Sequence, residues 1–162
     1  MKTAIYPGTF DPITFGHIDV IKKSLTIFDR VIVATTDNIN KNYYFSINDR
    51  VNIINNSLFK DLKMNKKRIK DISFDNLTID LCKKYKANAI IRGLRAVSDF
   101  EYEFQLAGMN KKLNSNIETM FLMSDVENQI ISSKFVKEIA SLGGNINRFV
   151  SKYTVKMLKN KF

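Results

Sequence analysis

Along most of the chain, short apolar runs alternate with segments of helical periodicity. The runs RVIVAT, from Arg30 to Thr35, and ANAIIR, from Ala87 to Arg92, are mostly apolar, as expected of strands buried on both faces. Between such runs, apolar residues recur every three or four positions, as in Ile18, Ile21 and Leu25. Strands separated by helices favour a parallel sheet covered on both faces. We therefore predict an α/β fold, a doubly wound parallel sheet of five strands that is Rossmann-like.

The same pattern predicts the position of each element. Strands are expected at residues 2–6, 30–35, 68–73, 87–92 and 118–123, and helices at residues 16–28, 46–58, 77–85, 98–112, 132–142 and 147–159. A length of 162 residues is typical of one domain, which we place over residues 1–162.

Several features of the sequence indicate the cellular compartment of the protein. No apolar run approaches the roughly 18 residues of a membrane span, and the first residues enter a strand without a signal-peptide pattern. The single cysteine, Cys82, fits a reducing compartment and lies on an expected helical apolar stripe. We therefore expect a cytoplasmic protein with no membrane partner.

The net charge of +10 arises from 26 basic and 16 acidic residues, and it is uneven. Residues 60–86 hold nine basic residues against four aspartates, which is the kind of cluster that binds nucleic acid. No aromatic residue lies between Lys60 and Ile72, so a stacking platform is not indicated. We interpret the cluster as a solvated surface and expect no nucleic-acid partner, while an RNA-binding module stays the alternative class. The excess charge can attract anionic substrates.

The stretch YPGTFDPITFG, residues 6–16, joins the first strand to the first helix and is followed by His17. Gly16 and His17 fall at the helix start, where free N–H groups and the helix dipole favour an anion. Thr9 and Thr14 add two hydroxyls to the imidazole of the only histidine, which together indicate a phosphate site. Two plainer interpretations stay open. The stretch can be an ordinary Pro/Gly-rich turn between a strand and a helix, and the histidine can be only packed or solvated.

Three blocks resemble one enzyme family. The string GTFDPIT followed by Gly16 and His17 resembles the first signature of phosphopantetheine adenylyltransferases, within a superfamily of nucleotidyltransferases that shares a (T/H)xGH motif. IRGLRAVSDFEYE, residues 91–103, resembles the block after the family's fourth strand, and Ile131-Ser132-Ser133 with Lys137 resembles the C-terminal ISS signature. The blocks occur in the family's order and cover essentially the whole chain.

The resemblance implies transfer of the adenylyl group of ATP to 4'-phosphopantetheine, which gives dephospho-coenzyme A and pyrophosphate in coenzyme A biosynthesis. It further implies Mg²⁺ bridging phosphate oxygens with no dedicated protein ligands, a homohexamer, and coenzyme A as a candidate feedback ligand. Physically, one phosphate oxygen attacks the α-phosphorus of another phosphate, so catalysis should rest on positioning and electrostatic stabilisation.

The resemblance also assigns residues. Thr9 is expected to contact both substrates, and His17 to stabilise charge on the α-phosphate as the catalytic residue. Lys41 and Arg92 match the positions that hold the pantetheine phosphate, and Thr78 matches a position along the pantetheine arm. The ATP-binding set comprises Thr9, Phe10, His17, Gly93, Leu94, Arg95, Glu103, Asn128, Gln129, Ile130, Ile131, Ser132, Ser133 and Lys134.

Two positions depart from the family pattern. Asn128 stands where an aromatic residue is usual, and Lys134 follows the two serines in place of a serine or threonine. These departures bear on how the C-terminal loop contacts ATP. Glycerol-phosphate cytidylyltransferases also share the GH motif, but they are expected to have a histidine at position 14, where this chain has Thr14. Nicotinamide-nucleotide adenylyltransferases stay an alternative within the superfamily.

Overall fold

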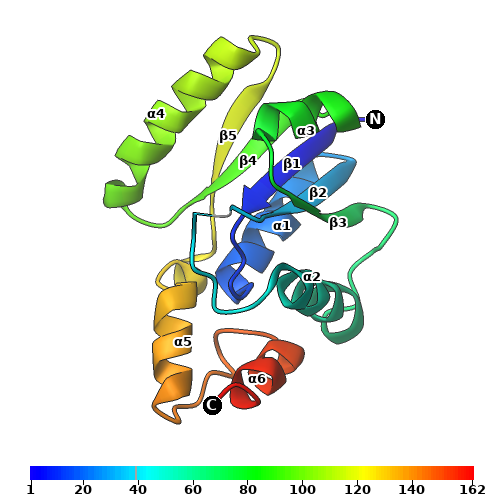
Figure 1. Cartoon of the computed structure of the whole chain (residues 1–162). Helices are drawn as coiled ribbons and strands as arrows, with labels where there is room; N and C mark the ends of the chain where they lie inside the picture. Colours follow the sequence, from blue (N-terminus) through cyan, green and yellow to red (C-terminus); the bar gives the residue numbers. More distant parts are fainter. Residues whose placement is uncertain (39) are drawn as a thin grey trace.

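The computed structural model describes residues 1–38 and 40–162, with only the backbone described at residues 97 and 98. Within the described residues, five parallel strands form one sheet in the order β3-β2-β1-β4-β5 (Figure 1). This arrangement confirms the predicted doubly wound α/β fold. The strands are β1 (Thr3–Gly8), β2 (Arg30–Thr36), β3 (Ile69–Phe74), β4 (Ala89–Leu94) and β5 (Glu118–Met123).

Helices connect the strands and complete the chain after β5. Two of the connections contain a short turn of different pitch, the π-helical η1 after α2 and the 3₁₀ turn η2 after β5. In chain order the elements are α1 (Phe15–Ile27), α2 (Ile47–Asn55), η1 (Asn56–Asp61), α3 (Thr78–Tyr85), α4 (Val97–Leu113), η2 (Val126–Asn128), α5 (Ser133–Ser141) and α6 (Lys152–Lys159).

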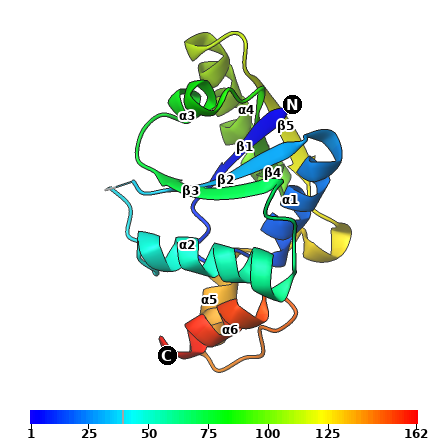
Figure 2. The same ribbon diagram turned by 90° about the vertical axis from the view of Figure 1, so that its right-hand side faces the viewer.

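Each face of the sheet has its own apolar core, because side chains alternate along a strand. On one face, Tyr6 and Val33 pack with residues of α1, α2, α5 and α6. On the other face, Ile5 and Ile32 pack with α3. Figure 2 shows α3 and α4 on one side of the sheet and α1, α2, α5 and α6 on the opposite side. The strands are thus covered on both faces, as their apolar runs predict.

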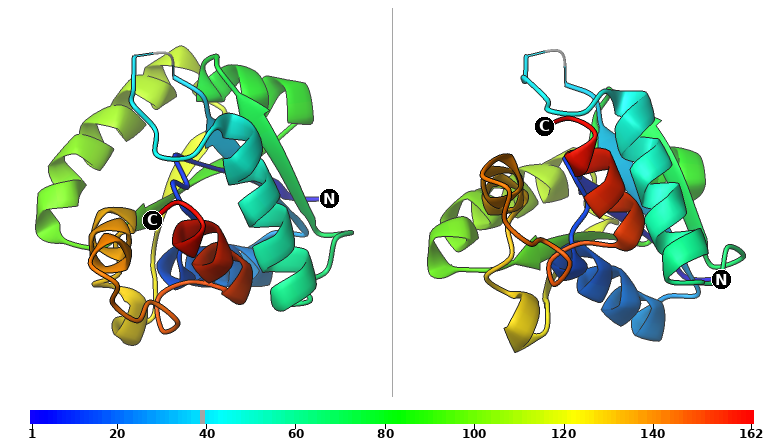
Figure 3. Two further views of the ribbon diagram at one scale, coloured as in Figure 1. Left: turned by 60° about the horizontal axis from the view of Figure 1, so that its bottom comes forward. Right: turned by 90° about the horizontal axis from the view of Figure 1, so that it is seen from below.

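The last helix begins later than predicted, at Lys152 instead of residue 147. The carbonyl of Phe149 accepts a hydrogen bond from the backbone N–H of Phe15 at 2.9 Å, which ties this segment to the start of α1. Ser151 then caps α6, because its hydroxyl accepts from the N–H of Thr154 at 3.3 Å. The Ser151 hydroxyl also lies 2.7 Å from that of Ser57 in η1, so α6 docks beside α2 and η1 (Figure 3). Tertiary contacts, which local periodicity does not encode, set this boundary.

In the part of the chain that the structure describes, no helix combines the length and apolar character needed to cross a membrane.

Candidate active site

A cavity of about 820 Å³ opens where the carboxyl ends of β1 and β4 meet the starts of α1 and α5. The sheet order reverses between β1 and β4, which is where ligands bind in open α/β sheets. Predicted site residues from all three signature blocks line this cavity, and Lys41 joins them from the loop after β2. Those that line it are Thr9, Phe10, His17, Lys41, Arg92, Gly93, Leu94, Arg95, Glu103, Ile131, Ser132, Ser133 and Lys134.

The imidazole of His17 is held in one orientation by the residue that precedes α1. The backbone N–H of Thr14 donates to Nδ1 at 3.0 Å, and the Thr14 hydroxyl lies 3.1 Å from the same nitrogen. Because Nδ1 accepts a backbone proton, a neutral ring must carry its own proton on Nε2. The structure therefore leaves Nε2–H as the donor that His17 can offer to a ligand.

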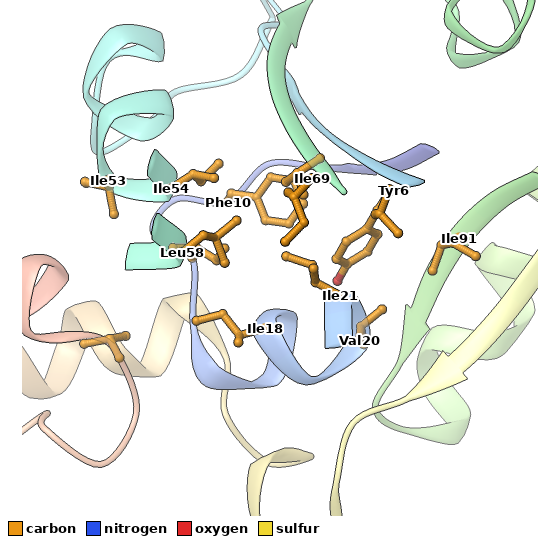
Figure 4. Packing of buried hydrophobic residues seen from close by; sticks show 14 of the residues in the cluster. Tyr6, Phe10, Ile18, Val20, Ile21, Ile53, Ile54, Leu58, Ile69 and Ile91 are labelled. Carbon is orange, nitrogen blue, oxygen red and sulfur yellow. The ribbon is translucent and has the colours of Figure 1, made fainter. Parts of the chain in front are cut away.

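The surroundings of His17 keep the ring neutral. Burial lowers the pKa of His17 to about 4, and the positive charge of Arg95 adds to this effect. The dipole of α1, at whose start His17 lies, also disfavours the protonated ring. The ring of Phe10 packs edge-on against the imidazole, with centroids 5.2 Å apart. The Phe10 side chain is itself buried and also packs against Tyr6, so it supports His17 from the core (Figure 4).

The side chain of Arg50 forms a hydrogen bond with the backbone of Thr9, a contact that the sequence does not predict. Its side chain is fully buried on α2, and Nη1 donates to the carbonyls of Thr9 at 3.0 Å and Thr36 at 2.8 Å. Nε donates to the carbonyl of Phe45 at 3.2 Å, and Nη2 pairs with Asp37 at 3.1 Å. One guanidinium thus joins the ends of β1 and β2 to the loop that carries Lys41.

A signal for Arg50 was present in the sequence. Position 50 lies on the same helical stripe as Ile47, Ile54 and Leu58, which periodicity directs inward. A charged residue on a buried stripe must find hydrogen-bond acceptors, and this is a reason to single it out.

Arg92 and Glu103 form a bidentate pair at the edge of the cavity. Nε of Arg92 donates to Oε2 of Glu103 at 2.7 Å, and Nη2 donates to Oε1 at 2.6 Å. Nη1 also donates to the carbonyl of Pro7 at 3.2 Å, which aligns the ends of β4 and β1. A guanidinium has five N–H donors, so two of them stay available for a ligand. Two residues that the sequence assigns to different substrates are therefore bonded to each other.

The other cations of the cavity differ in their pairing. Nε of Arg95 lies 3.5 Å from the carboxylate of Asp99, and Nζ of Lys137 lies 3.3 Å from the buried carboxylate of Asp11. Among the described residues, Lys41 and Lys134 form no ion pair. Their ammonium groups can neutralise an anionic ligand without first breaking an ion pair with a carboxylate.

The start of α5 forms the wall opposite α1. The hydroxyl of Ser132 accepts from the N–H of Phe135 at 3.2 Å, and the hydroxyl of Ser133 donates to the carbonyl of Pro12 at 2.7 Å. These bonds place the free N–H groups of a nine-residue helix at the cavity. A helix start of this kind stabilises phosphate.

Four predicted residues lie outside the cavity lining, as far as the described residues show: Thr78, Asn128, Gln129 and Ile130. Thr78 begins α3, and the other three belong to the connection between β5 and α5. In turn, the sequence did not single out Tyr6, Tyr102 and Ser124, which do line the cavity. Tyr6 could have been found, because it is the first residue of the stretch that joins the first strand to the first helix.

These features define a nucleotide-binding α/β protein with a GH histidine and two helix starts at one cavity. A family model described as cytidylyltransferase-like matches residues 5–139. The chain is 68% identical over 161 residues to a phosphopantetheine adenylyltransferase of Pelagibacter ubique. The aligned region covers 99% of this chain and 98% of that relative. A relative of the same name from Vesicomyosocius okutanii is 48% identical over 160 residues, with 99% and 98% covered. The chain belongs to the phosphopantetheine adenylyltransferase family.

Solved structures agree on the fold. A nicotinic acid mononucleotide adenylyltransferase of Plasmodium falciparum, complexed with NaAD, superposes with a TM-score of 0.74 over 99% of this chain and 96% of that one, at 18% identity. A putative nicotinate-nucleotide adenylyltransferase of Vibrio parahaemolyticus gives a TM-score of 0.72 over 98% and 91%, at 21% identity. At these identities the likeness shows the fold alone.

Proposed function

We propose that this chain transfers the adenylyl group of ATP to 4'-phosphopantetheine, forming dephospho-coenzyme A and pyrophosphate. The observation that supports this best is the full-length identity of 68% with a relative named for that activity. The cavity offers what the reaction needs, since a neutral donor and several cations face one space. A phosphate oxygen of the acceptor bonds to the α-phosphorus of ATP while the bond to the bridging oxygen breaks, and pyrophosphate leaves.

His17 is the proposed catalytic residue. Its Nε2–H would donate to a non-bridging oxygen of the α-phosphate, where negative charge grows during the transfer. The donor is pre-oriented by Thr14, so little reorganisation is needed at the moment of reaction. Thr9, whose carbonyl is fixed by Arg50, would contact both substrates at the meeting point of the two phosphates.

The acceptor phosphate is assigned to Arg92 and Lys41. The remaining N–H groups of Arg92 suit bidentate phosphate contact, and Lys41 supplies a mobile point charge. A second hollow of about 390 Å³ is lined by Asn40, which also lines the main cavity, and by Asn76, two residues before Thr78. We place the pantetheine arm along this hollow, which would bring it past Thr78.

Among the remaining predicted residues, those that line the cavity are assigned to direct contact with ATP. Its phosphates would lie between the starts of α1 and α5, and the β4–α4 segment would contact the rest of the nucleotide. Phe10 would contribute through its backbone, because its ring is buried. Dephospho-coenzyme A, the product, would occupy both halves of the cavity, and coenzyme A itself would compete for the same space as a feedback ligand.

We further propose that Mg²⁺ enters with ATP and would be held by the nucleotide, with no dedicated protein ligand. Where the structure describes the chain, no three His, Cys, Asp or Glu residues gather as a metal cluster. Mg²⁺ at nucleotide sites usually keeps several waters and binds substrate phosphates together with one or two carboxylates. The ion would neutralise charge on the phosphates, while the chain's own residues orient them.

A pyrophosphate-release assay tests the activity. With ATP, 4'-phosphopantetheine should support turnover, and nicotinamide mononucleotide and glycerol phosphate should not. An acceptor that lacks its phosphate should be inactive, since Arg92 and Lys41 would have nothing to bind. Turnover with nicotinamide mononucleotide in place of 4'-phosphopantetheine would overturn the proposed acceptor.

Nucleic acid is not proposed as a partner. The lysine-rich segment, residues 60–86, contributes no residue to the cavity lining among those described. A filter-binding titration with RNA across salt concentrations should show weak binding that salt abolishes. Tight, salt-resistant binding would favour the RNA-binding alternative.

We propose a homohexamer built from one domain over residues 1–162. Helix α4 and the neighbouring strand β5 lie at the outer edge of the sheet (Figure 1) and leave large apolar side chains exposed. Burial of such side chains would drive assembly despite the net charge. The exposed residues are Phe100, Tyr102, Phe104, Met109, Leu113 and Met123. Sedimentation showing only a species of the 18.7 kDa chain at micromolar concentration would contradict this proposal.

A cytoplasmic location stays a prediction for cell fractionation to test.

A further inference from the structure

The β5–α5 connection, residues 124–132, reaches the cavity at both ends but is only lightly packed between them. Ser124, Ile131 and Ser132 line the cavity. Between them, the side chains of Val126 and Ile130 are 81% and 82% exposed. Apolar packing therefore does not fix the middle of this connection, and polar contacts must do so.

Asp19 supplies two of these polar contacts. It lies on α1 two residues after His17, and only 8% of its surface is exposed. Its Oδ2 accepts from Nδ2 of Asn128 at 2.6 Å and from the backbone N–H of Asp125 at 3.3 Å. A buried carboxylate needs such donors, and a hydrogen bond to a charged group is stronger than a neutral one. Helix α1 thus carries both the imidazole and the anchor of the opposite wall.

The backbone of Asn128 transmits this anchor to the cavity. Its carbonyl accepts from the N–H of Ile131 at 3.2 Å, and Ile131 is the first residue of the connection's C-terminal end to line the cavity. The same carbonyl would lie 3.1 Å from a Cβ placed on Gly16. A side chain at position 16 would push the connection outward, so the glycine allows the close contact.

We propose that Asn128 is a positioning residue for ATP: by binding the Asp19 carboxylate, it fixes the start of α5 against the start of α1. The inference rests on the proposed function, in which ATP lies between these two helix starts. Asn128 does not touch the nucleotide in this account. It sets the distance between the wall that carries His17 and the wall that carries Ser132.

A reciprocal exchange of the two side chains tests the proposal. In Asn128→Asp two carboxylates face each other, which should open the connection and raise the KM for ATP by more than about tenfold, as loss of a charge-assisted hydrogen bond implies. In Asp19→Asn/Asn128→Asp the amide and the carboxylate exchange positions, and the bond can form again. The KM for ATP should then return to within about threefold of the unaltered chain.

The exchange separates positioning from simple repulsion. Both variants place a carboxylate at position 128 near the nucleotide, so repulsion of ATP by the new charge would persist in the double variant. Failure of the double variant to restore the KM would therefore overturn the proposal. An unchanged KM for ATP in Asn128→Asp would overturn it as well. The KM for 4'-phosphopantetheine should change less than about twofold in each variant.

Hydrogen exchange supplies a readout that does not depend on activity. In Asn128→Ala without substrates, the amides of residues 124–132 should exchange faster while those of β1 keep their protection. Equal exchange in this connection would contradict the proposed anchor. Lys23→Ala is the matched control, because the contacts of Lys23 with the same region are exposed: an ion pair with Asp125 at 2.8 Å and a hydrogen bond to the carbonyl of Met123 at 2.8 Å. Exposed pairs contribute little, so this variant should leave both the KM for ATP and the exchange unchanged.

Failure of the anchor and failure of the proposed function give different results. If the unaltered chain released no pyrophosphate with 4'-phosphopantetheine, the proposed function would fail, whereas faster exchange in Asn128→Ala would still support the anchor. If the unaltered chain were active and the exchange of Asn128→Ala were normal, the anchor alone would fail.

Discussion

The two walls of the cavity are held in different ways. The wall formed by β1 and α1 rests on the apolar core, where Tyr6, Phe10, Ile18 and Ile21 are at most 5% exposed (Figure 4). The wall formed by the β5–α5 connection exposes most of Val126 and Ile130 and depends on hydrogen bonds. His17, the proposed catalytic residue, is thus held by packing against Phe10 and by Thr14, while the segment assigned to ATP is held by a few polar contacts. Changes in the first wall should alter turnover, and changes in the second should alter affinity.

The largest effect is expected from His17→Ala. Loss of one donor to the developing charge should lower turnover on the order of 10² to 10³, with the KM of both substrates changed much less. Kinetics and melting temperature measured on one preparation test this. Thr14→Val is the matched control, because it keeps the backbone N–H that orients His17, and its turnover should stay within about fivefold. Near-normal turnover with a lowered melting temperature would make His17 a packing residue and remove the distinction between the walls.

Arg92 stands between the walls, and its replacement should affect the acceptor. In Arg92→Ala the kcat/KM for 4'-phosphopantetheine should fall on the order of 10², as expected for loss of charge-assisted phosphate contacts, with a smaller change for ATP. Arg92→Lys keeps the charge without the planar fork, and we expect an intermediate loss. Titrating each substrate at saturating levels of the other measures this split. A normal dependence on the acceptor would reject the assignment.

The ionisation of His17 sharpens the description of the first wall. Its pKa is lowered to about 4 from the usual 6.5, so between these values the unfolded chain binds a proton that the folded chain does not. The free energy of unfolding should therefore fall as pH decreases from 6.5 to 4, by a total on the order of 3 kcal/mol. Above pH 6.5 His17 should cause no such dependence on pH. Urea unfolding across this range, compared with His17→Asn, should reveal a flatter profile for the variant.

The single histidine makes a direct measurement simple. One set of imidazole NMR signals is expected, and its titration midpoint should lie below about pH 5, with the proton on Nε2 at neutral pH. A midpoint near 6.5 would mean that the ring is open to water and that packing does not shield the first wall.

The smallest effect is expected from Lys134→Ala. Lys134 is exposed on the second wall and lines the cavity without an ion pair among the described residues. Its loss should raise the KM for ATP about threefold at low salt and less at high salt, since exposed charges are screened. Lys112→Ala, at the far end of α4, is the control and should change nothing. An equal effect of both variants would mean that net charge alone attracts ATP.

Local pattern was enough to predict the elements and to place the signature blocks at one edge of the sheet. Parallel strands end at the same edge, so residues after β1 and β4 had to meet there, and His17 and Arg92 do. The partners of these residues were not predictable in the same way. Glu103 reaches Arg92 from another element, and Asn128 meets Asp19 across 109 positions. Such pairs depend on how helices dock on the sheet, which spacing along the chain does not specify.

Departures from local pattern had the same origin. Arg50 is a charged residue on an apolar helical stripe. It can be fully buried there because carbonyls of three segments accept its hydrogen bonds. Asn128 departs from the family's aromatic residue, and its bond to Asp19 gives that departure a structural role. In both cases a polar side chain is explained by its distant hydrogen-bond partners.

The burial of Arg50 has a consequence for the cooperativity of unfolding. Its guanidinium can be satisfied only when β1, β2 and the loop before α2 are all in place, because each contributes one carbonyl. Partial opening of any one of them would strand a charge away from water, which is costly. The ends of β1 and β2 should therefore not open as a local unit, and the amides of these two strands should exchange only through global unfolding.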